Sequence, residues 1–140
     1  MAPPALPAGP GGVSGTPSSV LLESLQAFLR EELQPQLSGF SAYNTRVAAN
    51  LLAILSREQE LGPALAALDR DFAATRGLPL EDLPRQLALA LRDGRLQPDP
   101  ELLRYLRRRS LLAMAIDNPR YAGYRRARAC WPEEDLPCTD

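Results

Sequence analysis

The amino-acid sequence predicts an all-α fold, a single bundle of about five antiparallel helices preceded by a disordered N-terminal segment. Apolar residues recur at helical spacing along most of the chain, and proline or glycine interrupts that spacing at intervals. No segment alternates apolar and polar residues with a period of two, so strands are not expected. The interruptions are short, and short connections favour antiparallel neighbouring helices.

The first element follows an uncharged segment, residues 1–17, which is rich in proline, glycine and small side chains. Such a segment buries too little apolar surface to offset the entropy of ordering it, so disorder is predicted there. The first helix is expected to begin between Thr16 and Ser19 and to end between Pro35 and Gly39, since proline suits the first turn and glycine the end of a helix.

A second helix is predicted over residues 41–61 and a third from Pro63 to Gly77. Gly62 followed by Pro63 is typical of a helix end, and Pro63 also suits the first turn of the next helix. On a helical wheel, apolar side chains of the second helix share one arc, which is predicted to face the core: Tyr43, Val47, Ala48, Leu51, Ile54 and Leu55.

The fourth and fifth helices have clearer end signals. Four leucines at helical spacing mark the fourth helix, with Asp82 as its N-cap and Gly94 at its end: Leu80, Leu83, Leu87 and Leu91. Asp99, followed by a proline and a glutamate, begins a fifth helix that ends near Asp117. Because residues 111–116 are apolar all round this helix, its second half is predicted to be central.

The predicted organisation is therefore a disordered segment (1–17), a helical bundle domain (18–121) and a C-terminal tail (122–140). The tail contains Cys130 and Cys138, and whether they pair is left open. Residues 1–19 lack the features of a signal peptide, and no apolar stretch approaches the ~18 residues of a membrane span. A cytoplasmic location without membrane association is expected.

Two absences limit the available chemistry. The chain has no histidine, and its sixteen basic residues are all arginine. The commonest general base and metal ligand is therefore missing, and so are Schiff-base and phosphate-loop lysines. Two cysteines alone fall short of the four ligands of a structural zinc site. A non-catalytic protein without metal or cofactor is expected, and a net charge of −1 gives no electrostatic case for nucleic acid.

Polar residues on the second helix allow two interpretations. A narrow strip is either a solvated face or a face that lets another helix approach, with Arg46 and Asn50 hydrogen-bonding across: Arg46, Asn50, Ala53, Arg57 and Glu60. Asn44 and Glu58 fall inside the apolar arc. A buried Glu58 would require a partner such as Arg104 or Arg120, whereas near the helix end it can reach solvent.

The most distinctive short motif is residues 117–121 (DNPRY). They either end the fifth helix, with Asn118 in the left-handed turn and displaced from the helix by the following proline, or present Asp117 and Arg120 to a partner. Two arginine clusters lie nearby, without the aromatic pattern typical of nucleic-acid binding: Arg104, Arg107, Arg108 and Arg109, then Arg125, Arg126 and Arg128.

Several of these segments together resemble a bacterial family, the domain of unknown function 6285 family: residues 46–54 (RVAANLLAI), 57–58 (RE), 60–62 (ELG) and 116–121 (IDNPRY). The resemblance covers residues ~20–121. It implies a small helical protein encoded beside aminoglycoside-phosphotransferase-like kinases and acyl-CoA dehydrogenases, with no assigned activity. It also favours one connected polar group, made of Arg46, Asn50, Glu58, Asp117, Asn118 and Arg120.

The sequence and the resemblance lead to an expected function. The leading hypothesis is a non-catalytic accessory domain that binds a partner protein, with the phosphotransferase-like kinase as that partner. A homodimer through the small residues of the second helix is a separate possibility. The alternative is a protein that binds an acyl-CoA or another phosphate-bearing ligand, or a minor enzyme in catabolism. In that case Arg46, Arg57 and Arg120 would hold the phosphate or carboxylate.

Overall fold

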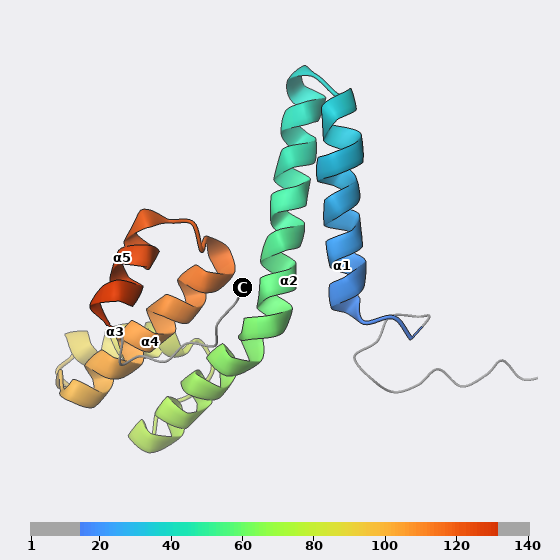
Figure 1. Ribbon diagram of the computed structural model, residues 1–140. Helices are drawn as coiled ribbons and strands as arrows, with labels where there is room; N and C mark the ends of the chain where they lie inside the picture. Colours follow the sequence, from blue (N-terminus) through green and yellow to red (C-terminus); the bar gives the residue numbers. More distant parts are fainter. Residues whose placement is uncertain (1–14, 132–140) are drawn as a thin grey trace, which may run out of the picture. The chain divides into compact units, whose positions relative to one another are not determined.

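The computed structural model describes residues 15–131, which contain α-helices and short helical turns but no strand (Figure 1). The all-α class predicted from the sequence is confirmed. None of the helices in this part of the chain combines the length and the apolar character needed to cross a membrane. The helices are α1 (Ser18–Ala27), α2 (Gly39–Arg76), α3 (Leu83–Arg92), α4 (Pro100–Asp117) and α5 (Ala122–Cys130).

The chain divides into two compact units, Met1–Gln59 and Glu60–Asp140. The first unit contains α1 and the first half of α2, and the second contains the rest of α2 with α3, α4 and α5. The antiparallel arrangement of all five helices in one bundle stays a prediction, and each unit is described by itself.

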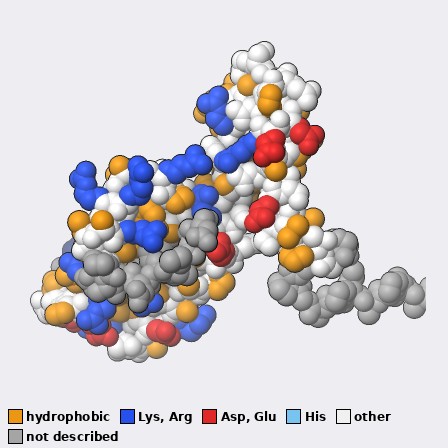
Figure 2. Space-filling model, viewed as in Figure 1, with side chains coloured by type: hydrophobic (Ala, Val, Ile, Leu, Met, Phe, Trp, Pro, Cys, Tyr) orange, Lys and Arg blue, Asp and Glu red, His pale blue; other side chains and the backbone are white. Residues whose placement is uncertain are grey.

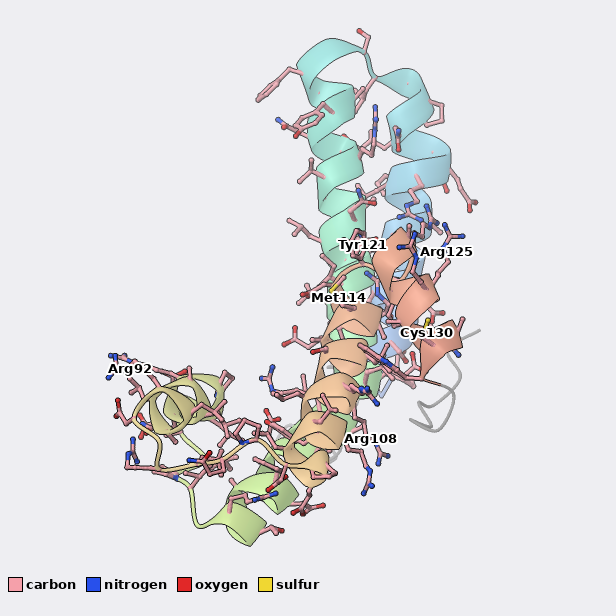
Figure 3. The ribbon with its side chains drawn as sticks, turned by 90° about the vertical axis from the view of Figure 1, so that its left-hand side faces the viewer. Arg92, Arg108, Met114, Tyr121, Arg125 and Cys130 are labelled. Atoms are coloured by element: carbon pink, nitrogen blue, oxygen red, sulfur yellow. The ribbon has the colours of Figure 1, made fainter. Side chains whose placement is uncertain are left out.

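The first unit is a helical hairpin. The helix α1 begins inside the predicted window and continues through a π-helical segment (Phe28–Leu33) and a short 3₁₀ turn (Gln34–Gln36). Gly39 has a φ of 57°, a left-handed conformation that glycine adopts without strain, and the chain reverses there. Figures 1 and 3 both show α1 beside the first half of α2.

The predicted helix break at Gly62 and Pro63 is wrong, because α2 continues through both residues. Proline lacks one backbone N–H and therefore removes a single helical hydrogen bond. The flanking residues compensate. Leu61 is 2% exposed, and good helix formers follow Pro63 at positions 64–68. The predicted end at Gly77 is confirmed, since Gly77 is left-handed (φ 61°) and the next amide donates back to the carbonyl of Ala73.

The helices α3 and α4 begin close to the starts predicted for the fourth and fifth helices. Asp82 precedes α3, but its side chain makes no capping hydrogen bond and its φ is 49°. Asp99 caps α4 as predicted, because its side chain accepts a 2.8 Å hydrogen bond from the amide of Leu102. Asn118 ends α4 with a φ of −153°, so the left-handed turn expected there is wrong, and the following proline accounts for the end.

The first part of the predicted C-terminal tail is helical. Residues 122–130 form α5, which packs against α4 and buries Tyr124. The sequence pattern lapsed there because the helix is rich in arginine and has few apolar residues to repeat. Cys130 at its end is exposed, whereas Cys138 lies outside the described residues.

The core of the second unit lies where α2, α3 and α4 meet. Phe72 and Tyr105 stack with ring centroids 3.9 Å apart, which places the C-terminal half of α2 against α4. The other members of the cluster are apolar and buried: Ala73, Leu83, Leu87 and Leu102. Further along α4, Leu111, Leu112, Ala115 and Ile116 are also buried, as predicted for its apolar second half.

Candidate interaction surface

The large apolar side chains of α2 in the first unit lie at the surface. The predicted core-facing arc is wrong for most of its members, because Tyr43, Val47, Leu51 and Leu55 are 38–57% exposed. The row that is least exposed instead consists mainly of small residues: Thr45, Ala49, Leu52 and Ser56. Small side chains let two helices approach closely, which explains why this row rather than the bulky one faces α1.

The partner helix is divided differently, because its inward row is mostly leucine. A half-buried row continues from α1 into the π-helical segment: Leu22, Gln26, Leu29 and Leu33. Directly before Leu22, Gln26 and Leu29 stand three apolar side chains that are 45–47% exposed: Leu21, Leu25 and Phe28. The hairpin therefore closes on one row of each helix and leaves further large apolar side chains outside.

These exposed rows share one face of the hairpin. Consider the residues that directly precede the inward-facing row in each helix. Because the two helices are antiparallel, these residues lie on the same side of the hairpin in both helices. One step back leads to Leu21, Leu25 and Phe28 in α1, and to Ala48, Leu51 and Leu55 in α2. We call these six residues the apolar face, and Figure 2 shows hydrophobic side chains at the surface of this unit.

The opposite face is polar, and a hydrogen bond confirms its position. One step forward from the inward rows leads to Arg30 in the first helical segment and Asn50 in α2. Nη2 of Arg30 donates to Oδ1 of Asn50 at 3.1 Å, so the two residues lie on the same side of the hairpin. Ala27 and Arg46 are exposed and occupy the same polar rows. Asn50 therefore hydrogen-bonds across the two helices, as in one of its two interpretations, while both Arg46 and Asn50 are exposed, as in the other.

The six residues predicted to form one polar group are divided between the two units: Arg46, Asn50 and Glu58 in the first, and Asp117, Asn118 and Arg120 in the second. All six are exposed. Glu58 reaches solvent, which is the simpler of its two predicted states. The convergence of all six stays a prediction, and so does the proposed clamp of Arg46, Arg57 and Arg120.

A polar network that the sequence did not single out joins α2 to α4 in the second unit. The Asp69 carboxylate accepts hydrogen bonds from the Tyr105 hydroxyl at 2.7 Å and from Nε of Arg109 at 3.0 Å. Burial, and then the hydrogen bond to Asp69, raises the pKa of Tyr105 well above its usual value. The spacing of these residues in the sequence could have indicated the network. Asp69, Phe72 and Arg76 share one face of α2, and Tyr105 and Arg109 share one face of α4.

A second ion-pair group lies at the other end of the same helix contact. Arg76 is 17% exposed and binds the Asp99 carboxylate at 2.7 Å and the Glu101 carboxylate at 2.7 Å. Its guanidinium also lies over the Phe72 ring, 5.4 Å from the centroid. The network and the ion pairs enclose the Phe72–Tyr105 stack, and their arrangement supports a structural role.

The Arg76 ion pair makes the second unit sensitive to acid. The hydrogen bond from Arg76, then that from the Leu102 amide, lowers the pKa of Asp99 below the usual value for an aspartate. A carboxyl group whose folded pKa is lowered contributes stability above the unfolded pKa and loses it as pH falls through the folded pKa. We expect the urea midpoint of wild type to fall below pH ~4 and that of Asp99→Asn, which keeps an N-cap, to fall less. If the urea midpoints of wild type and Asp99→Asn fall by the same amount between pH 6 and pH 3, this role is contradicted.

The predicted arginine clusters are partly used inside the second unit. Arg109 pairs with Asp69, while Arg107 lies 5.2 Å from the centroid of Trp131 and Arg128 lies 5.8 Å from that of Tyr124. Arg108 and Arg125 are exposed, and Figure 3 shows both extending away from their helices. Figure 2 shows basic side chains spread over this unit rather than lining a groove.

Two further observations concern ligands. Among residues 15–131, no group of three or more His, Cys, Asp or Glu side chains is placed to hold a metal ion. A shallow hollow of about 340 Å³ lies beside α3, lined by residues including Glu81, Asp82 and Arg85. It contains none of the three arginines predicted to clamp an anionic ligand, so it gives the small-molecule alternative no specific support.

The fold and these surfaces define a class: an all-helical protein whose N-terminal hairpin is apolar on one face and polar on the other. A family model described as a domain of unknown function (DUF6285) matches residues 35–121, and the chain belongs to that family. The resemblance found in the sequence is thereby confirmed. No curated protein and no solved structure matches the chain.

Proposed function

We propose that this chain is a non-catalytic interaction protein that works by binding another protein through the apolar face of its hairpin. The observation that carries the proposal is the exposure of Leu21, Leu25, Phe28, Leu51 and Leu55 on one side of a folded helical pair. Isolated exposed apolar residues are common, but a contiguous group rimmed by polar residues is typical of a protein-binding surface.

The resemblance suggests one partner, the phosphotransferase-like kinase encoded beside members of this family. Co-expression of the two proteins and gel filtration at micromolar concentration test this choice. A matched pair of variants connects the result to the surface. Leu25→Gln/Leu55→Gln changes the apolar face, whereas Glu23→Gln/Ala27→Gln places the same number of glutamines at exposed positions on the polar face of the hairpin.

If the kinase covers the apolar face, the first variant is expected to lose co-elution and the second to keep it. Independent elution of the wild-type proteins would exclude the kinase as the partner. The wider proposal fails if, in addition, the wild-type chain associates with no copy of itself and the two variants behave as wild type does.

A further inference from the structure

We infer that the apolar face binds a second copy of this chain, so that two hairpins form a four-helix bundle. The inference rests on the proposed function, because it names the protein that occupies the same surface. Its starting point is the shortage of buried apolar residues in the first unit. Among residues 15–59, Ala49 is the only buried hydrophobic residue, although the segment carries large apolar side chains throughout.

A two-helix pair of this kind does not supply its own core. Most helical stability in proteins comes from packing of an apolar face. In this hairpin the inward rows hold four leucines that are only half-buried, interrupted by Gln26, Thr45 and Ser56. The remaining large apolar side chains lie on the outer side, where a second layer of helices can bury them.

The area available is close to what a stable dimer needs. The five large residues of the apolar face, with Val47 at its edge, are each about half exposed. Side chains of this size then leave roughly 80 Å² each to be covered, or roughly 1,000 Å² over two copies. Stable interfaces bury ~1,200–2,000 Å² in total, a range that the surrounding polar rim would bring within reach.

The face is also self-complementary in charge. Its six residues carry no charge, so it offers nothing to attract an acidic or a basic partner. Polar residues end these rows at both ends of the hairpin: Glu32 and Asn44 near the turn, and Ser18 and Glu58 at the other end. An uncharged surface of this kind can meet an identical surface without placing like charges opposite each other.

The levels of the side chains show how two copies fit. The Arg30–Asn50 hydrogen bond fixes the register of the hairpin. Leu25 lies five residues before Arg30, and Leu55 lies five residues after Asn50, so both lie at the same level along the hairpin, farther from the turn. By the same reasoning Phe28 lies near the level of Leu51. A two-fold axis parallel to the helices keeps these levels, so Leu25 meets Leu55 of the second copy and Phe28 meets its Leu51. Each level then becomes one four-residue layer of the bundle.

The test is the mass of the full chain in solution, measured by light scattering and sedimentation from ~1 to ~100 μM. A reducing agent is present so that Cys130 and Cys138 form no bond between copies. Wild type and Glu23→Gln/Ala27→Gln are expected to be dimers. Leu25→Gln/Leu55→Gln is expected to raise the dissociation constant at least ~100-fold, because each substitution acts twice in a two-fold interface.

A second measurement covers the case in which the variant also loses helix. The melting temperature of a dimer rises with protein concentration, whereas that of a monomer does not. We expect such a rise for wild type and for the polar-face control. A wild-type monomer at ~100 μM, or a dimer that the two leucine substitutions leave intact, overturns the inference.

The failures of the two proposals can be told apart. A wild-type monomer that binds the kinase, and loses it in Leu25→Gln/Leu55→Gln only, overturns the dimer and supports the interaction function. A monomer that binds no kinase contradicts both. A dimer disrupted by the apolar-face variant alone supports both, with the second copy as the partner.

Discussion

Replacing Leu83 with alanine is expected to lower the free energy of unfolding of the second unit by about 2–5 kcal/mol. Leu83 is 1% exposed and belongs to the cluster formed by α2, α3 and α4. The substitution removes three buried carbon atoms and leaves a cavity that its neighbours fill only in part. Urea unfolding, monitored by tryptophan fluorescence, measures this loss of free energy, because the single tryptophan, Trp131, lies in this unit.

A matched control comes from the same predicted leucine stripe. Leu80 is three residues earlier and 50% exposed. Leu80→Ala should change the same free energy by no more than about 0.5 kcal/mol. Similar losses in the two variants would mean that the observed core of this unit is wrong.

Replacing Asp69 with alanine is the second substitution with a large expected effect, about 2–3 kcal/mol. It leaves the Tyr105 hydroxyl and the Arg109 guanidinium without their shared acceptor. The Asp69 and Arg109 side chains are 15% and 28% exposed, so the effect should stay below that of breaking a fully buried pair.

Three comparisons make this prediction specific. Asp69→Asn keeps an acceptor for the Tyr105 hydroxyl and should lose less stability than Asp69→Ala. Asp71→Ala, at an exposed position two residues away, should have little effect. The pKa of Tyr105, measured by ultraviolet absorbance titration, should fall in Asp69→Ala because the acceptor and its negative charge are gone. An unchanged tyrosine titration would contradict the network.

Helix positions followed largely from local chemistry. Asp99, Gly77 and the asparagine–proline pair after α4 act through the backbone of their own turn, so the sequence located these ends correctly. The helix break predicted at Pro63 was wrong, because packing along the whole of α2 outweighs the penalty of one missing hydrogen bond. The helix α5 was missed because arginines replace the apolar repeat on which the prediction depended.

The orientation of α2 was harder to predict than its existence. A helical wheel shows that Tyr43, Val47, Leu51 and Leu55 share an arc, but not what that arc faces. Burial by the chain itself was assumed, whereas the hairpin closes on Ala49 and its small neighbours. Asp69 was overlooked for a related reason: a lone acid shows its partners only after the fold brings α2 and α4 together.

The order of the two units along the chain has a consequence for synthesis. The hairpin precedes residues 60–131, and a ribosome adding about 5–20 residues per second needs roughly 4–14 s to make them. Helices form in about a microsecond, so a newly made hairpin can expose its leucines for seconds before the second unit exists. Several ribosomes on one messenger RNA would hold such hairpins near each other, which favours pairing between nascent chains.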